Sequence, residues 1–369
     1  MPNTWLEVDL DVIEANTQAV RALIGGGVQL FAVVKADGFG HGAPPVARAA
    51  LRGGASALAV AYLDEALRLR GEGITSRIIV LTPGPTDGIR AAQNQRLEVV
   101  LGDPEHARAV GEVAARTPVA LRVHAKVDTG LGRYGVLAEQ FPELLQQIAG
   151  QPALRLVGVC SHTARGADPG ETQKQLTQFL QAASAAPSGI ARHFANSAAT
   201  ATLPAARLEA VRVGAFLYGL TLGLPSELLP AVRPALAWRA RLVHVKRIPT
   251  GHPVGYGSLF RAERETTVGL VAVGYAHGYP YQLSNKSVAI AGGRRVPVIG
   301  SVCMDMLSLD LTDVPPAKVG DTVTLLGAQG AVHITAEELA EKAQTIPYDI
   351  VTGLPSHLRR EYTGKAAAR

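Results

Sequence analysis

The chain of 369 residues contains only two cysteines, and they form no recognisable pattern. Cys160 and Cys303 lie far apart in sequence, so they indicate neither a disulfide framework nor a metal site. No apolar run approaches the roughly 18 residues of a membrane span, and the first residues lack the basic and apolar blocks of a secretion signal. We therefore expect a cytoplasmic protein with reduced thiols and no membrane contact.

Charged residues are also few, at 18% of the chain, whereas hydrophobic residues make up 47%. A chain of this length and composition can bury a large core and predicts two domains. The net charge of +5 would suit a nucleic-acid partner. Lys and Arg are scattered along the chain, however, and they form no basic stripe, which argues against nucleic-acid binding.

Strand-like and helical segments alternate over the first 230 residues. An initial strand is expected at 5–10, and helical spacing is clear at 63–70 and 141–148. Eight further β-rich segments follow the initial strand, at 31–35, 57–61, 77–82, 97–101, 120–128, 156–162, 191–196 and 210–214. Eight βα units predict a closed parallel (β/α)8 TIM-like barrel. An open doubly wound sheet would share the alternation, but no G-x-G-x-x-G motif follows the first strand.

The pattern changes near residues 225–234, beyond which short alternating runs are separated by Gly, Pro and Asn. These runs indicate a second, all-β domain. The expected organisation is α/β, with a barrel domain at 1–230 and a C-terminal β domain at 231–369. The strand at 5–10 is surplus to the barrel and is available to pair with the second domain.

The segment 31–42 is the most informative, because an apolar strand ends there in a single lysine followed by a glycine-rich turn. Partial desolvation at the mouth of a strand would lower the pKa of Lys35 and supply the uncharged amine that a Schiff base requires. The glycines at 38, 40 and 42 would let the backbone approach a ligand closely. On this segment alone, an ordinary βα turn with a surface lysine stays open.

Active sites of such barrels lie at the carboxyl ends of the strands, so the residues at those ends belong together. The expected ends carry Lys126 to Arg133, His162, Asn196 with Ser197, and Arg212 to Ala215. The last two ends commonly hold a phosphate. A lysine, a phosphate site and a facing arginine together predict pyridoxal 5'-phosphate as the cofactor.

The chain closely resembles the bacterial alanine racemases over nearly its whole length. Eight short motifs match that family in order, and they fall in both expected domains. They are Ala32–Lys35, Lys126–Arg133, Ala195–Ala198, Val211–Arg212 with Gly214 and Tyr218–Gly219, Val254–Gly257, Gly274–Ala276, Val302–Asp305 and Ile346–Tyr348. The resemblance implies an enzyme that interconverts L-alanine and D-alanine, the latter a precursor of the cell wall. It also implies a homodimer in which the β domain of one subunit completes the active site of the other.

The resemblance assigns roles to individual residues. Lys35 would bind the cofactor aldehyde and exchange the substrate proton on the D-alanine face, while Tyr256 of the partner chain would serve the opposite face. His162, with Arg212 behind it, would favour the phenolate of that tyrosine. Arg212 would face the pyridine nitrogen and discourage its protonation, which favours racemisation over transamination.

Further roles follow from the same resemblance. Arg133 would lie near the cofactor phenolate oxygen and the substrate carboxylate, and a carbamylated Lys126 would orient it. Met304 would bind substrate through its backbone amide. Tyr275 and Tyr348 would line the entry corridor. The residues expected to bind the cofactor, besides Lys35, Arg133, His162 and Arg212, are Asn196, Ser197, Gly214, Ala215 and Tyr348, the last through the phosphate.

Four residues depart from the family pattern. Phe39 stands where a tyrosine commonly donates to the phosphate, His277 replaces an aspartate, Tyr281 lies near an expected arginine, and Ser301 stands where arginine is frequent. Substrate breadth is therefore open, and a serine racemase or a broader racemase of the same fold is an alternative. Less favoured alternatives are a decarboxylase of basic amino acids, which needs an acidic partner for the pyridine nitrogen, and a carrier of the cofactor, which lacks the β domain.

Overall fold

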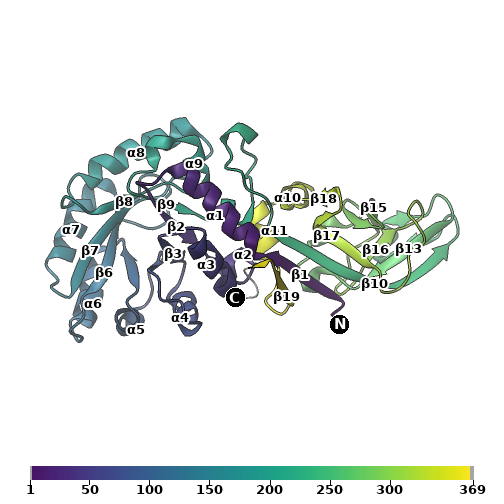
Figure 1. Cartoon of the computed structure of the whole chain (residues 1–369), viewed down its shortest axis with the longest axis horizontal. Helices are drawn as coiled ribbons and strands as arrows, with labels where there is room; N and C mark the ends of the chain where they lie inside the picture. The colour runs from purple at the N-terminus through teal and green to yellow at the C-terminus, as the bar shows by residue number, and fades with distance from the viewer. Residues whose placement is uncertain (1, 366–369) are drawn as a thin grey trace. The chain divides into compact units, whose positions relative to one another are not determined.

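The structure, a computed structural model, describes residues 2–365. The chain forms two compact units, a barrel unit of Ile13–Gly38 with Ala43–Val232 and a C-terminal unit of Met1–Val12, Phe39–Gly42 and Arg233–Arg369 (Figure 1). Within residues 2–365, no helix combines the length and the apolar character that a membrane crossing requires. The cytoplasmic location stays a prediction.

Eight parallel strands close the barrel in the order β2 to β9, which confirms the predicted fold class. The strands are β2 (Gln29–Val33), β3 (Ala57–Val60), β4 (Ile78–Val80), β5 (Glu98–Leu101), β6 (Leu121–Lys126), β7 (Leu154–Cys160), β8 (Ala191–His193) and β9 (Ala210–Val213). The helices of the first 202 residues are α1 (Leu10–Ile24), α2 (Lys35–Phe39), α3 (Ala43–Arg52), α4 (Leu63–Gly71), α5 (Ile89–Asn94), α6 (Pro104–Ala114), α7 (Phe141–Ala149), α8 (Pro169–Ala183) and α9 (Ser197–Thr202).

The barrel forms here because its strands are apolar on both faces while its helices are apolar on one. Every residue of β3, β4 and β9 is buried, as expected for parallel strands covered by helices. Helix α7 buries Phe141, Leu144, Leu145 and Ile148, the spacing of one helical face. Figure 1 shows α4 to α8 around the outside of the strands.

A nine-stranded sheet dominates the C-terminal unit, in the order β18-β17-β14-β15-β16-β13-β10-β1-β19. Its strands are β1 (Thr4–Asp9), β10 (Leu236–Ile248), β13 (Thr266–Val271), β14 (Val288–Ala291), β15 (Arg294–Ile299), β16 (Leu307–Asp310), β17 (Thr322–Gln329), β18 (Val332–Ile334) and β19 (Arg360–Thr363). Strand β1 pairs antiparallel with β10 and parallel with β19. The first strand of the chain thus belongs to this sheet.

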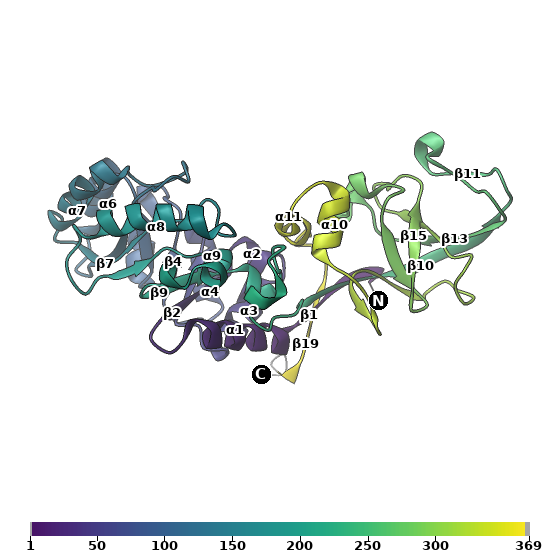
Figure 2. The ribbon, with the colours of Figure 1, turned by 90° about the horizontal axis from the view of Figure 1, so that it is seen from above.

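The C-terminal unit also contains helices, whereas the sequence predicted only strands. Helix α10 (Ala336–Ala343) packs against α11 (Pro347–Thr352), as Figure 2 shows. The side chain of Thr335 caps α10 by accepting from the amide of Glu338, a recognisable helix start. A separate two-stranded ribbon pairs β11 (Pro253–Val254) with β12 (Phe260–Arg261).

Candidate active site

Lys35 lies directly beyond the first barrel strand, at the start of α2. The backbone after it is left-handed, with φ of 51° at Ala36, 51° at Asp37, 62° at Gly38 and 53° at Phe39. Residues with a Cβ atom adopt these angles only when their surroundings impose them. The lysine is therefore presented by an unusual turn that requires outside support.

The carboxylate of Glu65 supplies that support. Its Oε1 accepts from the amide of Ala36 at 2.6 Å, and its Oε2 accepts from the amides of Ala61 and Tyr62 at 2.7 and 3.1 Å. One side chain on α4 thereby ties the segment after β2 to the segment after β3. Glu65 was not predicted from the sequence, although an acidic residue at the third position of a helix is a known capping signal.

The environment of Lys35 favours its neutral amine. Burial lowers the pKa of Lys35, the nearby Arg133 lowers it further, and Glu65 opposes both. A lowered pKa increases the share of neutral amine, which is the nucleophile that aldehyde chemistry needs.

Five basic side chains converge at the carboxyl end of the barrel. Burial holds the pKa of His162 well below its usual range, and the neighbouring charges of Arg212, Lys126, Arg133 and Lys35 act in the same direction. The cluster combines residues from the ends of β2, β6, β7 and β9. Such a concentration of basic groups favours anionic ligands.

Asp128 shapes the loop that carries Arg133. Its Oδ1 accepts from the amides of Gly130 and Leu131 at 2.9 and 2.8 Å, and its Oδ2 accepts from the amide of Arg133 at 3.0 Å. Burial alone would raise the pKa of Asp128, but these amide donors outweigh it and leave the pKa lowered. The loop is thus organised around an anion, and the guanidinium of Arg133 is not part of that bonding.

Lys126, the last residue of β6, is only 8% exposed. Burial lowers its pKa to about 8, with contributions from the charges of Arg212 and Arg133, although Cys160 and Asp128 act in the opposite direction. A substantial fraction of this amine is therefore neutral near pH 8, which carbamylation by dissolved carbon dioxide requires.

Arg212 on β9 is buried and makes hydrogen bonds through both terminal nitrogens. Nη2 donates to the carbonyl oxygen of Ser161 at 2.6 Å and to Nδ1 of His162 at 3.1 Å, while Nη1 donates to Nδ1 of His193 at 2.5 Å. Because arginine only donates, His162 accepts at Nδ1 and carries its proton at Nε2 in the neutral ring. His162 can therefore donate to an acceptor placed beyond it.

The strand ends at β8 and β9 lie together. The amide of Gly214 donates to Oγ of Ser197 at 3.0 Å, and the side chain of Asn196 caps α9 by accepting from the amide of Ala199. Helix α9 begins at Ser197, and a 3-10 turn begins at Ala215. First-turn amides have no partner within their own helix, so two sets of donors meet at this edge.

These residues fit pyridoxal 5'-phosphate. Lys35 offers an amine with a lowered pKa, and the turns at Ser197 and Ala215 offer amides to a phosphate. The basic cluster would balance the charge of that phosphate. Within the described chain, the hydrogen bonds of Arg212 leave from Nη1 and Nη2, so Nε is available to a ring nitrogen.

Four of the expected site residues belong to the C-terminal unit, namely Tyr256, Tyr275, Met304 and Tyr348. Tyr256 opens a 3-10 turn between two glycines of positive φ and is 78% exposed. Tyr275 and Met304 are also exposed and lie side by side, because the amide of Ala276 donates to the carbonyl of Met304 at 3.0 Å.

Tyr348 lies on α11, with its ring centroid 5.7 Å from that of Phe39. Burial raises the pKa of Tyr348 to about 12. The other divergent residues also lie in this unit. The rings of Tyr281 and Tyr275 meet edge to face at 6.4 Å, His277 faces His357 at 6.2 Å, and Ser301 donates to the backbone of Tyr256.

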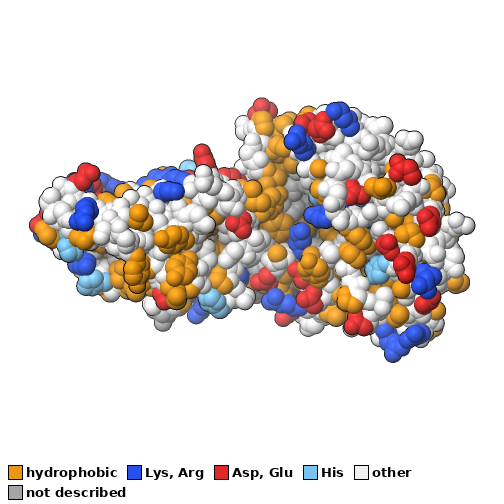
Figure 3. All heavy atoms as spheres, turned by 180° about the vertical axis from the view of Figure 1, so that it is seen from behind, with side chains coloured by type: hydrophobic (Ala, Val, Ile, Leu, Met, Phe, Trp, Pro, Cys, Tyr) orange, Lys and Arg blue, Asp and Glu red, His pale blue; other side chains and the backbone are white. Residues whose placement is uncertain are grey.

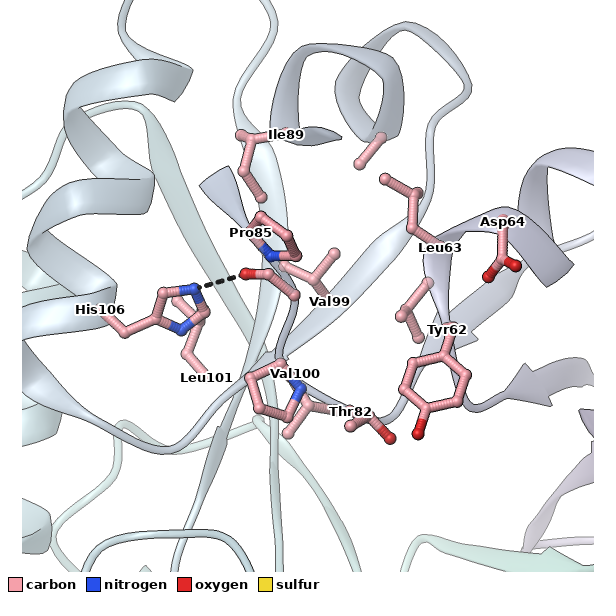
Figure 4. A pocket seen from close by; sticks show the side chains of 14 residues that line it. Tyr62, Leu63, Asp64, Thr82, Pro85, Ile89, Val99, Val100, Leu101 and His106 are labelled. Carbon is pink, nitrogen blue, oxygen red and sulfur yellow. Dashed lines mark hydrogen bonds between the residues drawn. The ribbon is translucent and has the colours of Figure 1, made fainter. Parts of the chain in front are cut away.

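A separate cavity of about 360 Å³ lies beside the carboxyl ends of β4 and β5 (Figure 4). It is mostly apolar, and none of the expected site residues lines it. His106 bonds to the carbonyl of Gly84 at its rim. The cavity lacks the converging polar groups of the basic cluster, so we do not place the chemistry there.

Comparison with known proteins places the chain in a family. The alanine racemase N-terminal domain family matches residues 8–222, and the alanine racemase C-terminal domain family matches residues 235–362. An alanine racemase of Symbiobacterium thermophilum is 40% identical over 377 residues, which cover 100% of this chain and 99% of that protein. The barrel, the β domain and these matches define a racemase of amino acids.

Solved structures agree with that class. The alanine racemase of the D-cycloserine producer Streptomyces lavendulae superposes with a TM-score of 0.93 at 35% identity, over 99% of this chain and 98% of that chain. A histidine racemase of Leuconostoc mesenteroides superposes with a TM-score of 0.89 at 27% identity, over 98% of both chains. The chain belongs to the alanine racemase family.

Proposed function

We propose that the protein interconverts L-alanine and D-alanine with pyridoxal 5'-phosphate as its cofactor. The family assignment supports the reaction. The observation that carries the proposal is the basic cluster that includes Lys35, because it places an amine of lowered pKa among cations that would balance a phosphate and a carboxylate.

The chain's own residues would hold the cofactor at its aldehyde, its ring and its phosphate. Lys35 would bind the aldehyde, Arg212 would face the ring nitrogen, and Arg133 would lie near the phenolate oxygen and the substrate carboxylate. His162 would complete the wall of the site. The phosphate would lie against the residues at the last two strand ends and α11, namely Asn196, Ser197, Gly214, Ala215 and Tyr348. When bound, the cofactor withdraws electrons from the substrate Cα and so makes its proton removable.

Two bases on opposite faces would move that proton. Lys35 would exchange it on the D-alanine face, and Tyr256 of a partner chain would exchange it on the L-alanine face. A phenol with a pKa near 10 needs a donor that favours its phenolate. The proton of His162 at Nε2, fixed by the hydrogen bond from Arg212 to Nδ1, is suited to that task.

Arg212 would also direct the outcome of the reaction. Its guanidinium stays charged, so it would not give a proton to the ring nitrogen as an acidic residue would. A weaker electron sink favours return of the proton to Cα, which is racemisation. The same residue argues against a decarboxylase of basic amino acids, which needs an acid at this position.

We further propose that Lys126 is carbamylated. A cation between Arg133 and Arg212 is unfavourable, and its pKa of about 8 leaves neutral amine available for the modification. The product would be an anion able to orient Arg133 and to relieve the excess positive charge.

A homodimer with shared active sites is part of the proposal. The C-terminal unit, which we propose as a domain serving the partner subunit, exposes many large apolar side chains: Tyr256, Leu259, Tyr275, Tyr281, Met304, Met306 and Ile346. Figure 3 shows hydrophobic side chains on one face of this unit. Exposed apolar surface of this kind is typical of an interface. In the proposed dimer, Met304 would lie against the substrate of the other chain.

Loss of optical rotation from L-alanine, measured with purified protein and added cofactor, tests the function. The same assay should include L-serine, L-histidine, L-lysine and L-arginine. The structural likeness to a histidine racemase and the divergent residues make the range of accepted amino acids a question for measurement. We expect alanine to be the best substrate. Carbon dioxide release from lysine or arginine would favour a decarboxylase, and binding of cofactor without any turnover would favour a carrier.

A further inference from the structure

A continuous chain of hydrogen bonds runs from Arg212 to a carboxylate on the opposite side of the barrel. Nη1 of Arg212 contacts Nδ1 of His193 at 2.5 Å, and Nε2 of His193 contacts Nδ1 of His124 at 2.9 Å. Nε2 of His124 then contacts Oε2 of Glu98 at 2.9 Å. We call these four residues the Glu98–Arg212 chain.

The Glu98–Arg212 chain lies inside the barrel. Glu98 is the first residue of β5, His124 lies within β6, His193 ends β8 and Arg212 lies within β9. Their exposed fractions are 1%, 0%, 0% and 5%. Such a polar path through the core is costly unless every member is satisfied.

The chemistry of the side chains fixes the direction of every bond. Arginine only donates, so Nδ1 of His193 accepts and its Nε2 carries the proton. Nε2 of His193 therefore donates to Nδ1 of His124, whose own proton lies on Nε2 and is donated to Glu98. A second proton on either ring would put two N–H groups face to face, so both histidines are neutral.

The pKa directions agree with that assignment. Burial lowers the pKa of His193 well below its usual range, and the charge of Arg212 adds to the effect. Burial also lowers the pKa of His124, although Glu98 opposes it. For Glu98 itself, burial alone would raise the pKa, but hydrogen bonds from His124 and Arg77 leave it far below its usual value.

The chain connects a buried cation to an anion. Among the described residues, Arg212 bonds to carbonyl oxygens and to two imidazole nitrogens, and to no carboxylate. Glu98 also forms ion pairs with Arg77 at 3.0 Å and with Arg122 at 2.7 Å. The side chains of these two arginines are 36% and 38% exposed. The carboxylate is thus fixed from outside the barrel and polarises the two rings from within.

A glycine makes room for this path. A Cβ atom on Gly158 in β7 would lie 2.1 Å from Nδ1 of His124 and 2.7 Å from its Cε1. The register of β6 against β7 also shifts between Val123 and His124. The local structure of both strands therefore accommodates the His124 ring in one position.

We propose that Glu98 is a positioning residue for the racemase reaction, acting through His124 and His193 to hold Arg212. This inference rests on the proposed function, since it concerns the residue that would face the cofactor ring. With Nη1 held by His193, and Nη2 held by the carbonyl oxygens and His162, the guanidinium cannot rotate. Its Nε is then the donor left for the ring nitrogen.

The first test needs no activity. Histidine nitrogens labelled with ¹⁵N in the cofactor-free protein should show His124 and His193 as neutral rings protonated at Nε2. A doubly protonated ring, or a proton on Nδ1 of either residue, overturns the proposal. This result stands whether or not the protein racemises alanine.

The second test uses matched variants of the full chain loaded with cofactor. His124→Leu breaks the path, whereas a glutamine at 124 offers one acceptor and one donor and can continue it. We expect His124→Leu to lower kcat about 10-fold with KM for alanine within about 2-fold, by analogy with other residues that orient site ligands, and His124→Gln to recover most of the loss. Equal activity in both variants and the wild type overturns the proposal.

Two further variants keep the test decisive if His124→Leu does not fold. Glu98→Gln retains shape but removes the charge, so it should lower kcat. Arg122→Gln removes one ion pair of the same carboxylate but keeps all four residues of the Glu98–Arg212 chain, and Arg77 still bonds both oxygens of Glu98. It should therefore leave kcat within about 2-fold. Equal losses in these two variants would mean that only the stability of the barrel is affected. An inactive wild type would refute the proposed function instead.

Discussion

The hydroxyl of Ser301 donates a 2.5 Å hydrogen bond to the backbone carbonyl of Tyr256. Ser301 is 4% exposed, whereas the Tyr256 side chain is 78% exposed. The neighbouring Gly255 has φ of 75°, and a Cβ atom there would lie 2.9 Å from the amide of Ser301. A buried serine thus holds the turn that presents an exposed phenol.

Removal of that hydroxyl should disturb the turn. Because a carbonyl that loses its partner costs about 1–3 kcal/mol when water cannot replace it, we expect Ser301→Ala to lower kcat from L-alanine by up to about 10-fold. Cofactor affinity should not change. The control is Ser258→Ala, an exposed serine of the same turn. A Ser301→Ala enzyme as active as this control would show that the hydrogen bond does not position Tyr256.

Replacement of Tyr256 by Phe should separate cofactor binding from proton exchange. The absorbance of bound cofactor depends on Lys35 and should persist. Exchange of the Cα proton of L-alanine with deuterated solvent should fall far more than exchange from D-alanine, because only one face loses its base. In contrast, Lys35→Ala should lose both the absorbance and all turnover. Full activity in Tyr256→Phe would refute the two-base assignment.

Mixing of inactive variants tests the shared site. If Lys35 and Tyr256 of different chains form one site, a Lys35→Ala chain paired with a Tyr256→Phe chain has one intact site and one that lacks both bases. Random reassortment gives half mixed dimers, so activity should recover to about a quarter of the wild-type value. Activity should be assayed before and after dissociation and reassembly. No recovery from mixtures shown to contain mixed dimers would place both residues in one chain.

The unusual pKa of Lys126 predicts a rise of stability at alkaline pH. The folded pKa is about 8, against 10.5 for an ordinary lysine. Between these values the unfolded chain binds the extra proton, so the free energy of unfolding should rise from pH 8 to about 10.5, by about 3 kcal/mol at ~1.36 kcal/mol per pH unit. Below pH 8 both states are protonated and the stabilisation is absent.

Denaturant unfolding of cofactor-free protein, in buffer free of carbon dioxide, measures this rise. The Lys126→Met variant should lack the rise in the free energy of unfolding. The difference between the two pH curves therefore gives the contribution of Lys126 separately from that of other titrating groups. Bicarbonate near neutral pH should stabilise the wild type and not the methionine variant if the lysine is carbamylated. Identical responses of both proteins to bicarbonate would contradict the modification.

Replacement of Phe39 by tyrosine should increase the affinity for the cofactor. It packs against Tyr348 at 5.7 Å between ring centroids, and the family resemblance implies a tyrosine that donates to the cofactor phosphate at this position. Phe39→Tyr should add one hydrogen bond to a charged acceptor, worth about 1.5 kcal/mol, and so lower the cofactor Kd about 10-fold. Equilibrium dialysis gives the Kd, with Phe39→Leu as the control. Weaker binding by the tyrosine variant would mean that the phosphate lies elsewhere.

The barrel was predictable from the sequence because each of its strands and helices has a recognisable pattern within a few neighbouring residues. Each strand, such as Ala57–Val60, is an apolar run between helical segments. The C-terminal helices were missed because short alternating strands dominate that region, although Thr335 with Glu338 marks a helix start. The left-handed turn after Lys35 was also hidden, since Ala36 and Asp37 do not favour the angles that they adopt.

The site residues near the carboxyl ends of the predicted strands, Arg212 among them, were found from the sequence. His124 and His193 lie before those ends, in the predicted segments 120–128 and 191–196, and were missed. Lys35, Lys126 and His162 come at or beyond strand ends, where barrel chemistry is expected. His124 and His193 contact each other although 69 residues separate them. The sequence does show charged or imidazole side chains inside apolar strands, as in Glu98–Leu101. Only the folded barrel, however, shows which of these side chains contact one another.

Glu65 limits how this protein can be re-engineered. Its carboxylate binds amides from two successive loops, at Ala36 and at Ala61 with Tyr62. The loop after β2, moved from this protein into another barrel, would arrive without the acceptor that shapes it, unless the start of α4 were moved with it. The first two βα repeats of the barrel should therefore be exchanged together, and the junctions of a chimeric protein should lie outside these two repeats.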